Sequence, residues 1–197
     1  VPLLLEHFRS AVPALRVEVT VYPNAEILHQ LREQRIQLGL MYLEQVPKDG
    51  PFEVQRLYAE HYVLIAAPSI PLPAEHRCGW AEAATLPLGL LNRNMHSRQL
   101  VDACFAQAGV VPQVMLETNV LELLHAEIMA GKVAGIMPIS ALPERTGLMP
   151  PLQVCRLDPS PAPDVGVLRL NQPNSTALLT RLWHVASTLE LDSIYTV

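Results

Sequence analysis

The feature that most limits the fold of this chain is a unit that occurs twice. Residues 17–41 read VEVTVYPNAEILHQLREQRIQLGLM, and residues 114–137 read VMLETNVLELLHAEIMAGKVAGIM. Each has a β-rich run, an Asn after Pro or Thr, a helix with apolar residues at helical spacing, and a strand containing Gly-apolar-Met. Both copies therefore predict a strand–helix–strand unit. Chance similarity is the alternative, because all such units share this period.

The second copy begins one strand earlier than the first. The run LPLGLL at residues 86–91 predicts a strand, which a polar loop joins to a helix over 97–108. The first copy has no such strand, because Val1 already lies within an apolar-periodic helix. We therefore expect the first strand of this copy and its loop to lie upstream of Val1.

The remaining predicted elements assign the chain to the α/β class, with two Rossmann-like lobes. They are a strand over 61–69, a Pro-rich connector over 158–164, a strand over 163–170 and a helix over 175–191. The simplest assembly places 1–67 and 164–197 in lobe I and 68–163 in lobe II. Two crossings, near 66–71 and 159–163, would then form a two-strand hinge. Strands that alternate with helices imply mostly parallel sheets.

Composition excludes several classes of protein. The chain has 197 residues, of which 50% are hydrophobic, but no apolar run approaches the ~18 residues of a membrane span. A net charge of −5 without a basic stripe argues against binding of a nucleic-acid backbone by this chain. The three cysteines are widely spaced and form no C-x-x-C motif, which indicates free thiols in a reducing cytoplasm.

No pattern of catalytic or metal-binding residues stands out. The sequence has no Walker A motif, no G-x-G-x-x-G after a strand, no G-x-S-x-G and no H-E-x-x-H. His125 and Glu127 are two apart on a predicted helix and cannot face one site. His96 is a lone histidine in the polar loop, where such a residue is more often exposed or a hydrogen-bond donor than a general base, and Cys104 lies on the apolar side of a helix. We therefore expect a binding protein with no metal and no cofactor.

Polar residues at the start of predicted helices suggest where a ligand binds. Thr118 and Asn119 stand where the strand of the second copy meets its helix. One explanation is helix capping, because Asn119 followed by Glu122 fits a capping box. The other is ligand binding, because α/β proteins hold small ligands where strands end and helices begin. Asn24 occupies the equivalent place in the first copy.

These features define a predicted binding cleft between the lobes. The residues assigned to it are Asn24, Ala66, Asn92, Arg93, Asn94, Thr118 and Asn119. Helix N-termini favour anions, and Arg93 or Arg98 has the geometry to pair with a carboxylate. The alternative for each arginine is a solvated surface charge.

The order of motifs resembles the effector-binding domain of LysR-type transcriptional regulators. The first half carries FRSAVPALRVEV and REQRIQLGLMY, and the second half carries RQLVDACFAQAGVVPQVMLETNVLELLHAEIMAGKVAGIMP. Each motif alone is degenerate, but their order and spacing over about residues 2–190 are specific. One departure is the run Arg35-Ile36-Gln37-Leu38, where many members have Gly-x-Asp-apolar.

The resemblance implies a fold of the type 2 periplasmic-binding-protein kind and a cytoplasmic regulator. A winged helix-turn-helix domain upstream would bind DNA, and this part would sense a small effector, of which we expect a carboxylate. It also implies antiparallel dimers, with a tetramer as an option for the full-length protein. We expect Leu3, Leu4 and Phe8 of the first helix to meet the helix 97–108 of the partner. The alternative is a solute-binding protein of a transporter, which shares the fold and would have a signal peptide upstream.

Overall fold

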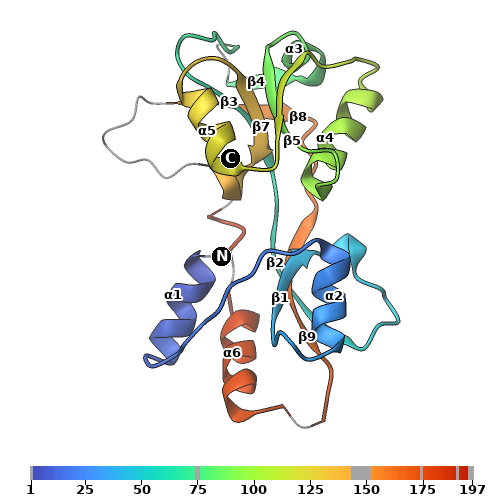
Figure 1. The fold of residues 1–197 in the computed structure, drawn as a ribbon, viewed down its shortest axis with the longest axis vertical. Helices are drawn as coiled ribbons and strands as arrows, with labels where there is room; N and C mark the ends of the chain where they lie inside the picture. The colour runs from blue at the N-terminus through green and yellow to red at the C-terminus, as the bar shows by residue number, and fades with distance from the viewer. Residues whose placement is uncertain (1, 74–75, 143–151, 174, 190, 195–197) are drawn as a thin grey trace. The chain divides into compact units, whose positions relative to one another are not determined.

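The chain forms two compact units in a computed structural model that describes residues 2–73, 76–142, 152–173, 175–189 and 191–194. Unit 1 comprises Val1–Ala59 and Pro163–Thr196, and unit 2 comprises Glu60–Ala162. The chain therefore passes between the units at 59/60 and at 162/163. Each unit is built on its own sheet (Figure 1).

Unit 1 consists of a small sheet covered by helices on both faces. Its elements are α1 (Pro2–Ala11), α2 (Asn24–Arg32), β1 (Gly39–Tyr42), the 3-10 helix η1 (Leu43–Gln45), β2 (Phe52–Ala59), β9 (Asp164–Leu170) and α6 (Ala177–Ser187). In the described part of the chain, the sheet has three strands in the order β1-β9-β2, and both pairings are antiparallel.

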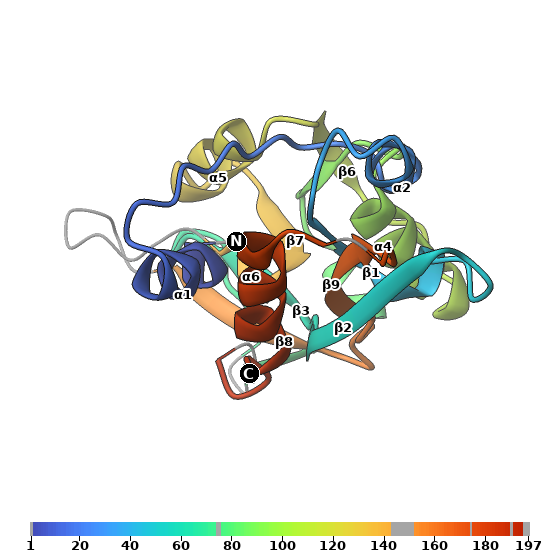
Figure 2. The ribbon, with the colours of Figure 1, turned by 90° about the horizontal axis from the view of Figure 1, so that it is seen from below.

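Alternation along β9 explains why both faces of this sheet are covered. Val165 and Val167 pack with α1 and α6, whereas Leu168 packs with α2 and β1. Because successive strand residues point to opposite faces, this pattern places α2 on one face and the other two helices on the other. Figure 2 shows α1 beside α6 and α2 across the sheet from them.

The packing of α1 corrects one expectation. Leu4 and Phe8 were expected to supply a surface for self-association, but both are buried against Leu182 and Ala186 of α6. They lie four residues apart and so share the helix face that meets α6. Leu3 is half-buried.

Unit 2 is built on a larger mixed sheet. Its elements are β3 (Tyr62–Ala66), β4 (Arg77–Gly79), α3 (Trp80–Ala83), β5 (Leu88–Leu91), α4 (His96–Gln107), β6 (Val114–Thr118), α5 (Leu121–Met129), β7 (Ala134–Pro138), the 3-10 helix η2 (Ile139–Ala141) and β8 (Gln153–Asp158). Among the described residues, the strand order is β4-β8-β3-β7-β5-β6. Helices α3 and α4 pack on one face, and α5 packs on the other.

The first crossing lies earlier in the chain than predicted, because β3 belongs to unit 2. All five residues of this strand are buried, and it pairs with β7 on one side and β8 on the other. The predicted boundary, with 1–67 in lobe I and a crossing near 66–71, differs from the structure, in which the chain enters unit 2 at Glu60. The continuous apolar run of β3 indicates a central strand but does not identify the sheet to which it belongs.

The expectation of mostly parallel sheets was wrong. The pairings β5–β6, β5–β7 and β4–β8 are parallel, but β3 is antiparallel to both of its neighbours and unit 1 has only antiparallel pairs in its described part. The strands β3 and β9 follow the crossings between units, and each runs against the strands beside it. Strand–helix–strand periodicity predicts only the parallel part.

Residues 17–21 were predicted as the first strand of the repeat. They are exposed, and in the described residues they pair with no other strand. The helices of the described segments are all too short or too polar to cross a membrane.

Candidate functional site

The predicted polar residues of unit 2 meet at one edge of its sheet. Strands β5 and β6 run parallel with Leu91 opposite Thr118, so both end at the same edge. The backbone N–H of Asn92 donates to the carbonyl of Thr118 at 3.0 Å, which joins the two strand ends. Asn92, Arg93 and Asn94 therefore lie beside Thr118 and Asn119, as their positions after the two strands predict.

Thr118 is the buried residue of this edge. It is only 8% exposed, and its Oγ1 accepts the N–H of Val120 at 3.0 Å. Helix α5 begins at Leu121, with Val120 as the N-cap residue and no side-chain cap. The capping box proposed for Asn119 and Glu122 is therefore wrong. The helix starts one residue later than that pattern requires, and Asn119 is left exposed.

The two arginines of this region differ in environment. Arg98 is 2% exposed, and its guanidinium donates to the carbonyl of Leu91 at 2.6 Å, to Glu117 at 3.0 Å and to Asp102 at 2.8 Å. It is therefore a buried structural cation and not a solvated one. The side chain of Arg93 is 77% exposed and lies 3.8 Å from Glu117. That separation makes it the arginine available to a ligand.

A shallow depression adjoins this edge of the sheet. It is lined by Tyr62, Leu90, Leu91, Ser97, Arg98, Val101, Ile136 and Pro138. These residues bring the ends of β5 and β7 together with the first turn of α4. The end of β7 lies at this edge because β5 and β7 are parallel.

Two predicted residues lie outside this cluster. Asn24 belongs to unit 1, where it is the first residue of α2 and its Nδ2 donates to Oε1 of Gln45. Pro23 precedes the helix, so Asn24 is not its N-cap residue. Ala66 has no exposed surface and lies in the core of unit 2. A side chain without accessible surface cannot contact a ligand unless the core opens.

Sequence reasoning missed a second buried group close to this edge. Glu60 is 2% exposed, and its carboxylate accepts the backbone N–H of Ser140 at 3.2 Å and the hydroxyl of the same serine. Ser140 lies in η2, directly after β7. The available signal was a carboxylate immediately before the apolar run of β3, since an unpaired charge is costly in such a place.

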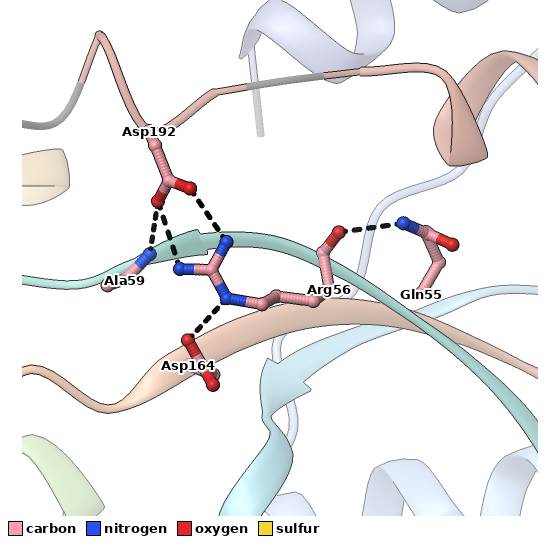
Figure 3. A network of polar contacts seen from close by, with 5 residues as sticks. All are labelled: Gln55, Arg56, Ala59, Asp164 and Asp192. Atoms are coloured by element: carbon pink, nitrogen blue, oxygen red, sulfur yellow. Dashed lines mark hydrogen bonds and ion pairs between the residues drawn. The ribbon is translucent and has the colours of Figure 1, made fainter.

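A polar network in unit 1 joins Asp192, which follows α6, to β2 and β9, the two strands next to the crossings between units (Figure 3). Nε of Arg56 lies 2.6 Å from Asp164, and Nη1 lies 2.7 Å from Asp192. Asp192 also accepts the N–H of Ala59 at 2.9 Å. The hydrogen bond to Asp192, followed in size by the one to Asp164, raises the pKa of Arg56 above its ordinary value. The network therefore fixes the end of β2 and the start of β9 to the segment after α6.

The three cysteines are free thiols, of which Cys78 and Cys155 are buried and Cys104 is half-buried. Burial raises the pKa of Cys78 to about 12, with a further contribution from Cys155. Burial also raises the pKa of Cys155 and of Cys104. Within the described ranges, no three His, Cys, Asp or Glu side chains form a group that could hold a metal ion.

Comparisons with known proteins identify relatives. The family model described as "LysR substrate binding domain" matches residues 1–187. An uncharacterized HTH-type transcriptional regulator of Bacillus subtilis strain 168, YybE, is 26% identical over 148 residues, which cover 75% of this chain and 48% of that protein. The chain thus spans about half the length of this curated relative.

Two solved structures have a similar fold. The Synechocystis PCC6803 CcmR regulatory domain in complex with 2-PG superposes with a TM-score of 0.77 at 18% identity, covering 96% of this chain and 92% of that one. Full-length CbnR complexed with its target DNA gives a TM-score of 0.74 at 21% identity, covering 94% of this chain and 64% of that one. These likenesses establish the two-lobe, periplasmic-binding-protein-like fold. Because the family model covers nearly the whole sequence, this chain belongs to the LysR substrate-binding domain family.

Proposed function

We propose that this chain is the effector-sensing part of a LysR-type transcriptional regulator. It binds a small polar or anionic molecule in the cleft between its lobes and contributes to self-association. The observation that supports this most is the junction of β5 and β6. There Asn92 and Thr118 are hydrogen-bonded, and exposed polar side chains gather at one strand edge. Such an edge is the usual ligand-binding place of α/β proteins.

The proposed contacts come from both units. Asn92, Arg93, Asn94, Thr118 and Asn119 form the unit 2 side, and Asn24 is the proposed contact from unit 1. Ala66 is left out because it is fully buried. Amides and hydroxyls can both donate and accept, which suits a ligand with several polar groups.

A carboxylate is the proposed anionic group of the ligand. Arg98 is already committed to Glu117, Asp102 and a carbonyl, so it has little capacity for a ligand. Arg93 is exposed and makes only a long contact with Glu117, and such surface pairs contribute little stability. Arg93 can therefore exchange this contact for a bidentate pair with a carboxylate.

Regulation and DNA binding belong to the proposal for the whole protein. A helix-turn-helix domain upstream would bind DNA, while this chain, with a net charge of −5, would not. The match to the LysR family favours this role over a solute-binding protein of a transporter, which would use the same fold. The proposed location is the cytoplasm, and the proposed assembly is a dimer, with a tetramer in the full-length protein.

A ligand screen with paired variants tests the site. Thermal shift with 2-PG, short dicarboxylates and their neutral amides should reveal acids that stabilise the chain, and titration calorimetry then gives their affinities. Arg93→Ala and Thr118→Ala should each weaken the binding of such an acid by about 1 to 3 kcal/mol. The matched control is Arg77→Ala on β4, because Arg77 is similarly exposed, at 63%, and lies 3.7 Å from Asp158. Unchanged affinity in the folded Arg93 and Thr118 variants would place the pocket elsewhere.

A further inference from the structure

Glu60, the residue at which the chain enters unit 2, is a buried carboxylate. A buried carboxylate is costly unless hydrogen-bond donors compensate for the lost water. Ser140 supplies two such donors, its backbone N–H to Oε1 and its hydroxyl to Oε2. One side chain of the first crossing therefore holds the middle residue of η2.

The same crossing holds η2 a second time. The N–H of Ile139 donates to the carbonyl of His61 at 2.8 Å. At the other end of η2, Nε2 of His125 in α5 lies 3.0 Å from the carbonyl oxygen of Ala141. Each residue of η2 thus has a polar contact, and two of the three are attached to Glu60 and His61.

The position of η2 connects this contact to the candidate site. It follows Pro138, which lines the same depression as Leu91 and Ser97. Just beyond His61, the N–H of Tyr62 donates to Oγ of Ser160 on the second crossing at 3.0 Å. A displacement of η2 would therefore be passed to the start of β3 and from there to the second crossing.

We propose that Glu60 is a positioning residue that makes η2 and the first crossing move as one segment. Its carboxylate fixes η2 beside the edge formed by the ends of β5, β6 and β7, so ligand contacts at that edge would act directly on the residues at which the chain enters unit 2. The link to effector binding rests on the proposed function. The coupling between Glu60 and η2 exists without a ligand and can be tested without one.

Amide hydrogen exchange of the ligand-free chain, measured residue by residue by NMR, is the test. Glu60→Ala removes both acceptors and should speed the exchange of the Ile139 and Ser140 amides by roughly tenfold or more. Glu60→Gln keeps one acceptor oxygen for the Ser140 N–H and should restore most of the protection. Ser140→Ala removes only the hydroxyl and should give a smaller change at the same two amides.

The control separates local coupling from general loss of stability. Val133→Ala leaves a cavity in the buried cluster under α5, and it should speed exchange throughout unit 2. The proposal is overturned if Glu60→Ala leaves Ile139 and Ser140 at wild-type rates. It is also overturned if that variant behaves like Val133→Ala, or if Glu60→Gln gives no rescue. None of these outcomes depends on a ligand, so each would leave the proposed effector site standing.

Discussion

Thr118 illustrates how one residue serves both the fold and the candidate site. Its buried Oγ1 accepts the N–H of Val120, at the place where β6 gives way to α5. Replacing Thr118 with Val keeps the shape and removes the acceptor, so the Val120 N–H loses its partner. Thr118→Val should therefore lower the free energy of unfolding by about 1 kcal/mol in urea titrations. Thr118→Ser retains the acceptor and should lose less. Equal stability of the Val variant and the wild type would contradict this role of the hydroxyl.

Cys78 leads to a prediction about alkaline pH. Burial raises its pKa from 9.0 to about 12 in the folded chain. The unfolded chain therefore releases the thiol proton at a lower pH than the folded chain does. The stabilising contribution is complete below about pH 9 and is lost as the pH rises towards the folded pKa.

Cys78→Ala removes this pH dependence. Between about pH 8 and pH 10.5, the wild type should lose roughly 1 to 2 kcal/mol more unfolding free energy than Cys78→Ala. Urea titrations at the two pH values measure the difference, and it is the change with pH that counts, since the Ala variant also leaves a cavity. Cys104→Ala is the control, because Cys104 is less buried. If the unfolding free energies of wild type and Cys78→Ala change equally with pH, the Cys78 thiol ionises equally well in the folded and unfolded chain.

At the scale of elements, the repeat explains why residues 17–21 are exposed. In unit 2, β5 lies between β6 and β7. In unit 1, β1 corresponds to β7 and residues 17–21 correspond to β6, but the described part of the sheet has no strand between them. Val19 and Val21 are exposed, whereas Val114 and Leu116 are half-buried against apolar clusters. These two pairs correspond, because they stand five and three residues before Asn24 and Asn119.

Hydrogen exchange should reveal this difference between the two copies. The amides of residues 17–21 should exchange much faster than those of β6, because they have no paired strand. If residues 17–21 are already as protected as β6 in the 197-residue chain, the proposed gap in the sheet does not exist.

Sequence patterns predicted elements better than they predicted their partners. The periodicity of the two repeats indicated α2, α5 and the strands after them, and the meeting of 92–94 with 118–119 followed from parallel strand ends. The strands β2 and β8 were missed because polar residues such as Arg56 and Arg156 interrupt their apolar pattern. The bond between Glu60 and Ser140 joins residues 80 positions apart, and no local pattern indicates such a pair.

At the scale of the whole molecule, self-association needs a surface other than Leu4 and Phe8, which are buried. Unit 2 has one in its edge strand and the loop before it. Met115 of β6 is 62% exposed, and Val111, in the loop between α4 and β6, is 91% exposed. Exposed apolar side chains beside the helix expected at the interface favour burial in a protein contact, so we predict that this surface meets a second copy.

Met115→Glu should therefore shift a dimer to monomer. Burying an unpaired carboxylate in a dimer contact is costly, so the dissociation constant should rise by at least about tenfold. Sedimentation equilibrium at tens to hundreds of micromolar chain measures the shift. Leu178→Glu is the matched control, because Leu178 of α6 is also an exposed apolar residue, at 47%, but belongs to unit 1. A wild-type chain that is monomeric at high micromolar concentration would refute self-association by this chain alone. An equal effect of the two substitutions would refute the role of the β6 edge, because the interface would then not be specific to that surface.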